Sequence, residues 1–301
     1  MNIKFDNVDF QSSSGPNNFG QKLAREIESR DSHTMVSSGQ DIQFSFIQIN
    51  ELFNPTILRL DGIYFNTAQD WKQQNLAIKR AYDASQHVIV QSDFNKALVE
   101  KYFGKKEEVS VIRNGTSIDL IDNIPFAKLG PNFEGKEVWM CASSWRPHKR
   151  LKANIEYFLE FSPSDAILLI AGKNPDHDPA SNRIFYVGNL DWHEMISLMK
   201  RASTFIHLSW LDHCPNVVVD ARASECKIVC SSTGGTHEIA GKGSIVIEEE
   251  DWDFSPIDLY NPPQLDFSKM RISQLDTPFN IKQTADDYIS IAQNILRKAS
   301  V

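Results

Sequence analysis

Two aspartates, Asp212 and Asp220, lie eight positions apart within residues 209–221 of this chain. An apolar run at residues 204–208 precedes the first of them and predicts a buried strand, and a second strand is predicted at 227–230. Acids that follow the carboxyl ends of parallel strands lie where open α/β sheets bind ligands. Carboxylate oxygens accept hydrogen bonds from hydroxyl groups. The pair is therefore suited to a ligand with several hydroxyls.

A turn that contains Gly234, Gly235 and Thr236 follows the second predicted strand and opens a short helix. Backbone N–H groups at such a helix start can face an anion such as a diphosphate. Two acids suited to hydroxyls and one anion-binding turn together point to a nucleotide-sugar. The alternative for the acids is structural, with Asp212 as a solvated loop residue and Asp220 as a helix cap.

A basic loop, residues 143–152, directly follows the first strand predicted in the second half of the chain. If they were held over a cleft, Lys149 and Arg146 could neutralise a diphosphate, and an arginine could do so through two parallel hydrogen bonds. A solvated basic loop is the plain alternative. Nucleic-acid binding is disfavoured because the cluster is short and the rest of the chain is acidic.

The stretch from Ser209 to Glu238 resembles the donor-binding segment of GT-B glycosyltransferases, specifically retaining family 4, the glycosyl transferases group 1. In that family two acids separated by seven residues run into a helix of small residues, a strand and a Gly-Gly-x-x-Glu turn. The resemblance implies that Asp220 holds ribose hydroxyls and Asp212 the donor sugar, helped by backbone amides around Pro215 and Asn216. The family usually has Glu at both acid positions, so each carboxylate here is one methylene shorter.

The resemblance also implies that the basic loop holds the β-phosphate of the donor. Lys149 matches the family's lysine, and Arg146 stands near the position of its arginine. In the first half of the chain, Gly15 lies in the place of a glycine-rich loop that faces the donor phosphates and the acceptor. Asp61 takes the place of a histidine that lies near the reacting sugar. These landmarks recur in order from Ile3 to Glu238, so the resemblance covers most of the chain.

Predicted strands alternate with predicted helices in both halves of the chain, which favours βαβ units and mostly parallel sheets. The expected fold is therefore α/β, and the resemblance implies two Rossmann-like domains that face each other across a cleft. We predict an acceptor-side domain at residues 1–125, a nucleotide-sugar domain at 136–282 and a closing helix at 283–301 that packs back on the first domain. The first helix is predicted at about 21–30, and the proline-rich segment 251–279, which shows little periodicity, is predicted to wrap a surface.

Composition is compatible with this organisation. A chain of 301 residues with 41% hydrophobic side chains can bury two cores. A net charge of −8 and a pI near 5.5 argue against a general nucleic-acid or membrane-surface binder, which leaves at most peripheral membrane contact. No window approaches the ~18 apolar residues of a spanning helix, and the N-terminus does not read as a signal peptide. We therefore expect a cytoplasmic protein.

Metal ligation is not expected from the sequence. The eight histidines and four cysteines show no metal-site spacing. The triplet Asp176-His177-Asp178 resembles the metal-binding Asp-x-Asp of GT-A glycosyltransferases, but it lies late in the chain within a proline-rich loop. The prediction is no metal and no cofactor other than the nucleotide-sugar substrate.

The expected function is transfer of a sugar from a nucleoside-diphosphate-sugar to a hydroxyl of a glycan, lipid or small molecule. The resemblance implies retention of anomeric configuration without a metal. Lys149 and Arg146 would stabilise the leaving diphosphate, and Asp212 and Asp61 complete the predicted catalytic set. One alternative is a sugar-nucleotide epimerase of the same fold, and another is a non-catalytic nucleotide-sugar-binding protein. The non-catalytic alternative is motivated by the aspartates that replace the family's usual residues.

Overall fold

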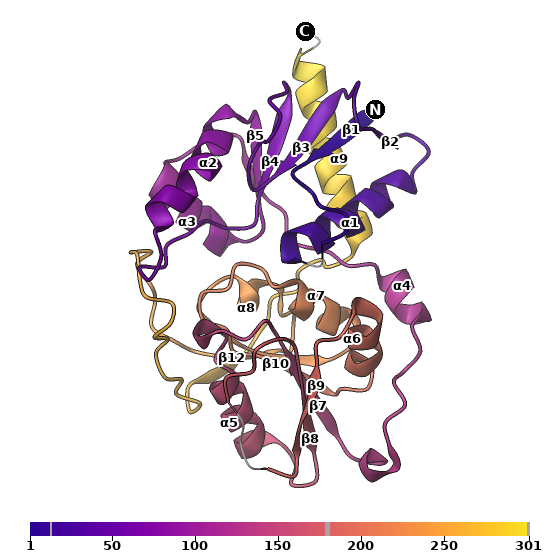
Figure 1. Ribbon diagram of the computed structural model, residues 1–301, viewed down its shortest axis with the longest axis vertical. Helices are drawn as coiled ribbons and strands as arrows, with labels where there is room; N and C mark the ends of the chain where they lie inside the picture. Colours follow the sequence, from indigo (N-terminus) through magenta and orange to yellow (C-terminus); the bar gives the residue numbers. More distant parts are fainter. Residues whose placement is uncertain (13, 178–180, 300–301) are drawn as a thin grey trace. The chain divides into compact units, whose positions relative to one another are not determined.

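The computed structural model describes residues 1–12, 14–177 and 181–299, which divide into two compact units (Figure 1). Unit 1 contains residues 1–117 and 254–257 and the chain from 278 onward, and unit 2 contains residues 118–253 and 258–277. The division between residues 117 and 118 lies before residue 125, where the sequence analysis ends the first domain.

The structure shows why the boundary lies so early. Helix α4 (Ile118–Asn123) opens unit 2. The Lys200 ammonium donates to the carbonyl oxygens of Ile121, Asp122 and Ile124 at 2.7–3.1 Å, which ties this helix to unit 2.

Unit 1 is built on a six-stranded parallel sheet in the order β2-β1-β3-β4-β5-β6. Its strands are β1 (Asn2–Asp6), β2 (Thr34–Met35), β3 (Ile42–Phe46), β4 (Thr56–Leu60), β5 (His87–Val90) and β6 (Val109–Val111). Every residue of β3, β4 and β5 is buried, as expected for parallel strands that helices cover on both faces. The helices are α1 (Gly15–Glu28), α2 (Trp71–Ala84), α3 (Asp93–Phe103) and α9 (Ile281–Ala299).

Helix α1 begins at Gly15, so the predicted start near residue 21 is wrong. Ser14 has extended backbone before the helix, and a proline in the first turn is compatible with a helix start because its missing N–H would have no intrahelical partner. Phe19, Leu23 and Ile27 are spaced by four and fully buried, which gives the helix its core-facing stripe. Gly15 is therefore the first helical residue and not part of a loop.

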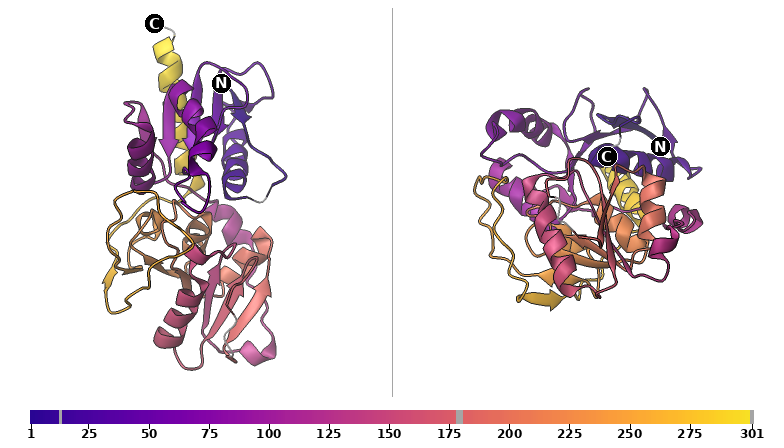
Figure 2. Two further views of the ribbon diagram at one scale, coloured as in Figure 1. Left: turned by 60° about the vertical axis from the view of Figure 1, so that its left-hand side comes forward. Right: turned by 60° about the horizontal axis from the view of Figure 1, so that its bottom comes forward.

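Helix α9 supplies part of the core of unit 1. Its residues Ile281, Ala285, Tyr288, Ile289 and Ala292 pack with side chains of α1 and of the central strands. The ring of Tyr288 lies 5.7 Å from that of Phe44 and 6.2 Å from that of Phe19, measured between centroids. Figure 2 shows α9 running beside α1.

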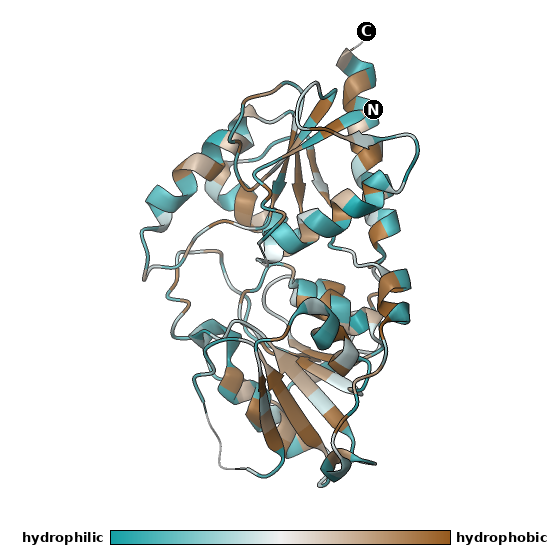
Figure 3. Ribbon diagram, turned by 45° about the vertical axis from the view of Figure 1, so that its right-hand side comes forward, coloured by the Kyte–Doolittle hydropathy of each residue, from teal (hydrophilic) through white to brown (hydrophobic). Residues whose placement is uncertain are grey.

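Unit 2 is built on a seven-stranded sheet in the order β13-β12-β11-β10-β7-β8-β9, parallel except for β13. Its strands are β7 (Val138–Ala142), β8 (Ile167–Ala171), β9 (Ile184–Gly188), β10 (Thr204–His207), β11 (Lys227–Ser231), β12 (Ile245–Ile247) and β13 (Met270–Ile272). Figure 3 shows that this sheet is largely hydrophobic. Its further helices are α5 (Leu151–Phe161), α6 (Trp192–Met199), α7 (Asn216–Ala223) and α8 (Thr236–Ile239).

Strand β13 lies within the segment 251–279, in which the sequence shows little periodicity. All three of its residues are exposed, and it pairs antiparallel with β12 at the edge of the sheet. A strand of three residues with no buried face leaves no alternating apolar pattern by which sequence analysis could find it.

Among the residues that the structure describes, no helix combines the length and the apolar character needed to cross a membrane.

Candidate functional site

Asp212 lies in the loop that follows β10, and the Gly-Gly turn after β11 packs against it. Leu211, directly before it, has a φ of +54°. The N–H of Gly235 donates to the carbonyl oxygen of Asp212 at 2.7 Å, and Asp212 and Gly234 form an isolated parallel bridge. Gly234 has a φ of +85°, and a Cβ added there would lie 2.5 Å from the Asp212 carbonyl oxygen. The turn therefore requires glycine at this position and holds the Asp212 loop in place.

The Asp212 carboxylate contacts one cationic and one polar side chain from neighbouring segments. Its Oδ2 atom lies 2.5 Å from Lys149 Nζ and 3.1 Å from His207 Nε2. Lys149 ends the short 3₁₀ turn η2 (Pro147–Lys149) after β7, and His207 is the last residue of β10. The lysine side chain is 19% exposed and the aspartate side chain 14%, so the pair remains open to solvent on one side.

Burial and charge set the protonation of this cluster. Burial by itself would raise the pKa of Asp212, but the Lys149 ammonium and the hydrogen bond from His207 hold that pKa well below its ordinary value. Burial lowers the pKa of His207 despite the nearby carboxylate. Burial, with added repulsion from Lys149, lowers the pKa values of His148 and His213 to about 4. At neutral pH the cluster thus contains an ionised Asp212 beside neutral imidazoles.

Asp220 occupies the middle of α7 and is 6% exposed. Its Oδ2 atom accepts a hydrogen bond of 3.0 Å from the indole Nε1 of Trp192, the first residue of α6. Asp191 and Glu194 form a capping box at this helix start. The cap fixes the helix that carries Trp192, and Trp192 in turn orients the Asp220 carboxylate.

Pro215 and Asn216 lie where α7 begins, directly after the Asp212 loop. Pro215 is the residue before the first turn, and its side chain makes no capping hydrogen bond. The N-terminal end of α7 therefore lies four residues from Asp212 along the chain. Thr236 begins the four-residue helix α8 and is fully buried. The Gly235 N–H donates to the carbonyl oxygen of Asp212, so an anion at this turn would have to be bound by other backbone N–H groups.

Two arginines of the basic loop have different environments. Arg146 is exposed at the start of η2. Arg150 is buried, and its Nη2 atom donates to Glu249 Oε1 at 2.6 Å and to the carbonyl oxygen of Pro263 at 2.9 Å. Sequence analysis singled out Arg146 and gave Arg150 and His207 no role. Neither Arg150 nor His207 lies in a local sequence pattern that would show that its side chain is buried.

Asp61 belongs to a separate polar cluster in unit 1, at the carboxyl ends of β4, β5 and β6. It pairs with Arg59 and accepts a hydrogen bond of 2.7 Å from Gln91 Nε2. Arg59 is fully buried, and it also donates to Asn114 Oδ1 at 2.8 Å. Burial raises the pKa of Asp61 although Arg59 opposes that shift. Gly15 is also in unit 1, exposed at the start of α1.

The structure therefore groups the predicted site residues in two sets. Lys149 and the turn at Gly234 each contact Asp212 in unit 2, and Asp61 lies in unit 1. No group of three or more histidine, cysteine, aspartate or glutamate side chains that could hold a metal occurs among the described residues. Of the triplet at 176–178, Asp178 lies outside them.

Comparison with known proteins identifies the class of enzyme. Residues 126–254 match the model of the family described as glycosyl transferases group 1. No curated protein matches the chain.

Solved structures match nearly the whole chain. Anabaena HepE in complex with UDP and glucose is 15% identical, with 100% of this chain and 99% of that chain covered and a TM-score of 0.64. WaaG, a glycosyltransferase involved in lipopolysaccharide biosynthesis, is 13% identical, with 99% and 92% covered and a TM-score of 0.60. Sucrose-phosphate synthase from Thermosynechococcus elongatus is 11% identical, with 100% and 98% covered and a TM-score of 0.59.

At these identities the structural matches establish the fold, and they confirm the predicted α/β architecture of two Rossmann-like domains with parallel sheets. The family match supplies the activity class and confirms the expected glycosyltransferase. The chain is therefore a glycosyltransferase of the GT-B fold that carries a glycosyl transferases group 1 domain at residues 126–254.

Proposed function

We propose that this glycosyltransferase moves a sugar from a nucleoside-diphosphate-sugar to a hydroxyl acceptor, with retention of anomeric configuration and without a metal. The observation that carries the proposal is the pairing of Lys149 with Asp212 beside the Gly-Gly turn of unit 2. In this proposal Lys149 is the cation for phosphate and Asp212 is the acid for hydroxyls. The HepE structures that contain UDP or UDP-glucose support a nucleotide-sugar as donor and put UDP-sugars first among the candidates.

Lys149 supplies the charge for the donor diphosphate. Without a ligand, its ammonium is balanced by the Asp212 carboxylate at 2.5 Å. A bound diphosphate brings more negative charge than one carboxylate, so the ammonium can turn toward it at little electrostatic cost. Exposed Arg146, at the start of the same short turn, adds a second cation. Both charges favour the transition state, in which negative charge builds on the departing diphosphate.

Asp212 and Asp220 supply acceptors for donor hydroxyls. The hydrogen bonds that reach the Asp212 carboxylate from Lys149 and His207 both end on Oδ2. Oδ1 is then the oxygen that receives a hydroxyl of the transferred sugar. On Asp220, the Trp192 indole is bound to Oδ2. We assign the Asp220 carboxylate to the ribose hydroxyls, with the backbone amides of α7's first turn, around Pro215 and Asn216, directed at the diphosphate.

The chemical step breaks the bond between the anomeric carbon and the diphosphate oxygen and forms one from that carbon to the acceptor oxygen. In the retaining reaction the acceptor enters on the face from which the diphosphate leaves. The acceptor proton passes to the leaving phosphate oxygen, so no further base is needed. Unit 1 binds the acceptor in this scheme, and Asp61 orients a hydroxyl there through Oδ2, which has no partner among the described residues.

A donor screen tests the proposal. UDP-, GDP- and ADP-sugars are compared by thermal shift and by release of free nucleotide, each with and without EDTA. We expect one nucleotide class to raise Tm and its sugar to be turned over equally in EDTA once an acceptor is present. Nucleotide release abolished by EDTA would remove the metal-independent scheme. Sugar isomerisation without an acceptor would instead identify an epimerase, and binding without any turnover a non-catalytic protein.

A further inference from the structure

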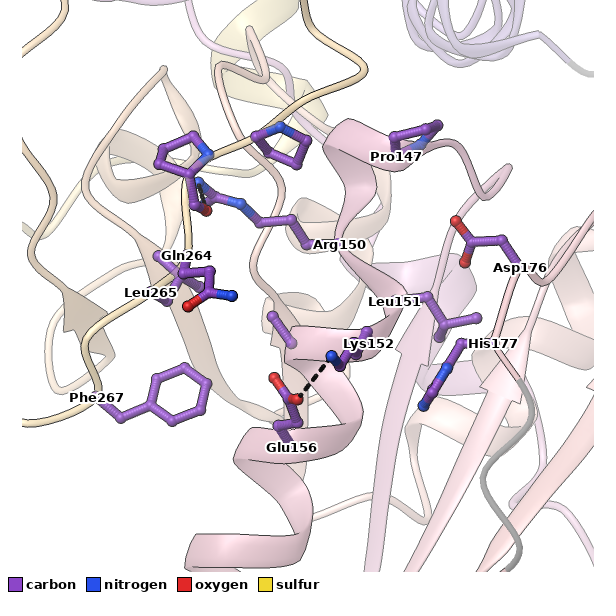
Figure 4. A pocket seen from close by; sticks show the side chains of 13 residues that line it. Pro147, Arg150, Leu151, Lys152, Glu156, Asp176, His177, Gln264, Leu265 and Phe267 are labelled. Atoms are coloured by element: carbon purple, nitrogen blue, oxygen red, sulfur yellow. Dashed lines mark hydrogen bonds and ion pairs between the residues drawn. The ribbon is translucent and has the colours of Figure 1, made fainter.

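A cavity of about 410 Å³ lies within unit 2, between the first turns of α5 and the segment 262–267 (Figure 4). A volume of this size is within the range of sites for small ligands. The polar side chains that line it are Arg150, Lys152, Glu156, Asp176, His177 and Gln264. None of the donor contacts proposed above lines it, since Lys149 turns toward Asp212 whereas Arg150 extends toward the segment that carries Gln264.

Arg150 is among the residues that line this cavity, and part of its guanidinium lacks a hydrogen-bond partner among the described residues. Its side chain is 3% exposed, and Nη2 is bound to Glu249 and to the Pro263 carbonyl oxygen. Its Nε and Nη1 atoms are buried and have no partner among the described residues. A buried N–H left without an acceptor costs free energy, so native structures nearly always satisfy such groups. The two donors therefore point to an acceptor that the protein itself does not supply.

Helix α5 adds a second, independent set of donors. It is 11 residues long, and its preceding residue Arg150 has left-handed backbone with a φ of +50°. The Arg150 side chain makes no capping hydrogen bond to the helix, and the first turn contains no acidic residue. The first-turn residues Leu151, Lys152 and Ala153 line the cavity, so the positive end of the helix dipole lies at its wall. An anionic group there would meet backbone N–H groups as well as the arginine.

The other residues that line the cavity indicate which kind of molecule could carry the anionic group. The carboxylates of Glu156 and Asp176 line the cavity, and Lys152 Nζ lies 3.6 Å from Glu156 Oε1. These acids disfavour a small, highly charged anion but accept hydrogen bonds from hydroxyls, as does the Gln264 amide. Phe267 and Leu265 add an apolar face. The wall thus matches a ligand that carries one anionic group on a body of several hydroxyls.

We propose that this cavity binds an anionic sugar, either a sugar phosphate or a sugar acid, with its anion at Arg150 and the start of α5. The site goes beyond the proposed transfer reaction, and its ligand binds independently of the donor. An anionic sugar would balance the guanidinium donors and place its hydroxyls against Glu156, Asp176 and Gln264.

The test is calorimetric titration of the full chain with glucose 6-phosphate, glucuronate, glucose and inorganic phosphate. We expect one of the first two to bind at least tenfold more tightly than glucose and than inorganic phosphate, and the tighter of the two identifies the anionic group. Saturating UDP should leave this affinity within twofold. Equal binding of inorganic phosphate and the anionic sugars would overturn the proposal, as would displacement by UDP or no binding of either anionic sugar.

Two variants locate the ligand. Arg150→Lys keeps a cation for Glu249 but removes the extra donors, and Ala153→Trp fills the cavity from the first turn of α5. Each should weaken binding at least tenfold, whereas Lys128→Ala, an exposed lysine of the same unit outside the cavity, should not. If a thermal melt shows that Arg150→Lys is not folded, the affinity of the Ala153→Trp variant for the anionic sugar provides the test. Unchanged affinity in a folded Ala153→Trp protein would contradict the assignment.

Discussion

The ammonium of Lys149 and the carboxylate of Asp212 lie 2.5 Å apart although 63 positions separate them in the chain. The sheet of unit 2 brings them together because β7 and β10 are neighbours in it and run parallel. The loops after both strands then leave the same edge of the sheet, which is where open α/β sheets bind ligands. The contact that carries the proposed donor site is therefore a consequence of strand order.

Replacing Lys149 with alanine should lower kcat by about 100-fold or more, the usual effect of removing one group that stabilises developing negative charge. The melting temperature should change far less, because the side chain is partly exposed and His207 remains bonded to Asp212. Steady-state kinetics and thermal unfolding of Lys149→Ala measure both effects, with exposed Lys128→Ala as the control. A folded Lys149→Ala protein with unchanged kcat would eliminate the assigned role.

Much of this arrangement could be predicted from residue patterns. The buried strand before Asp212 is a run of apolar residues, and the capping box at Asp191 and Glu194 has a recognisable spacing. Both signals are local, since each depends on residues within one turn or one strand. The parallel sheets follow from the alternation of such elements.

Other features depend on distant parts of the chain and could not be predicted. His207 lies at the end of an apolar strand. The loop after this strand brings Asp212 back to His207, and Leu211 within that loop has a positive φ. Arg150 and Arg146 belong to one short loop, yet Arg150 is buried because Glu249, 99 positions later, lies beside it. The early start of α1 was missed because its first turn contains glycine and proline, which are usual signs of a loop.

Replacing Asp220 with asparagine should weaken binding of the nucleoside diphosphate by about 10- to 100-fold. Hydrogen bonds to charged groups contribute about 1.5–3 kcal/mol, and the amide offers donors where ribose hydroxyls need an acceptor. The asparagine oxygen can still accept from the Trp192 indole, so the fold should be retained. Calorimetric titration with the nucleotide identified in the donor screen gives the affinity. The control is Asp165→Asn, an exposed aspartate of the same unit, and equal affinities for the two variants would refute the ribose contact.

The stability of the protein should fall with decreasing pH between about 6.5 and 4, partly because of His148 and His213. Burial lowers the pKa values of both imidazoles to about 4, whereas in the unfolded chain they titrate near 6.5. Within that window the unfolded state binds more protons than the folded state, so the free energy of unfolding decreases as the pH is lowered. His213→Asn removes one of these groups.

Urea unfolding of both proteins measures this effect. From pH 7 to 4.5 the His213→Asn variant should lose less stability than the wild type. Between pH 7 and 8 the difference between the two proteins should stay constant, since the histidine is neutral in both states there. An identical acid-induced loss in wild type and variant would mean that His213 does not contribute to the pH dependence.

Replacing Asp61 with alanine should destabilise unit 1 by roughly 3–5 kcal/mol, the usual cost of leaving a buried charge without its partner. Arg59 is fully buried and pairs with Asp61. Asp61→Asn should cost less, because its amide oxygen can still accept from Arg59 and Gln91. The matched control is Asp83→Ala, which breaks the surface pair with Lys79 and should cost about 0–1 kcal/mol. Urea denaturation compares them, and similar losses for Asp61→Ala and Asp83→Ala would contradict the prediction.

Two glycines of unit 2 separate the effect of backbone strain from that of a direct contact. Gly234 and Gly243 have nearly the same φ, +85° and +87°, but an added Cβ meets the Asp212 carbonyl oxygen at 2.5 Å in the first and open space in the second. Gly243→Ala should therefore cost only the strain of left-handed backbone, about 1–2 kcal/mol. Gly234→Ala should cost about 1–3 kcal/mol more, because the Asp212 loop must shift to relieve the overlap.

The same shift should change catalysis. Moving the Asp212 loop displaces its carboxylate from Lys149, so Gly234→Ala should lower kcat whereas Gly243→Ala leaves it within about twofold. Denaturant unfolding and steady-state kinetics of the two variants measure both consequences. If both variants lost the same stability and kept wild-type kcat, the close packing of the Gly-Gly turn on Asp212 would have no part in positioning the donor site. A selective loss in Gly234→Ala would tie the position of Asp212, and hence the donor contacts, to the absence of one methyl group.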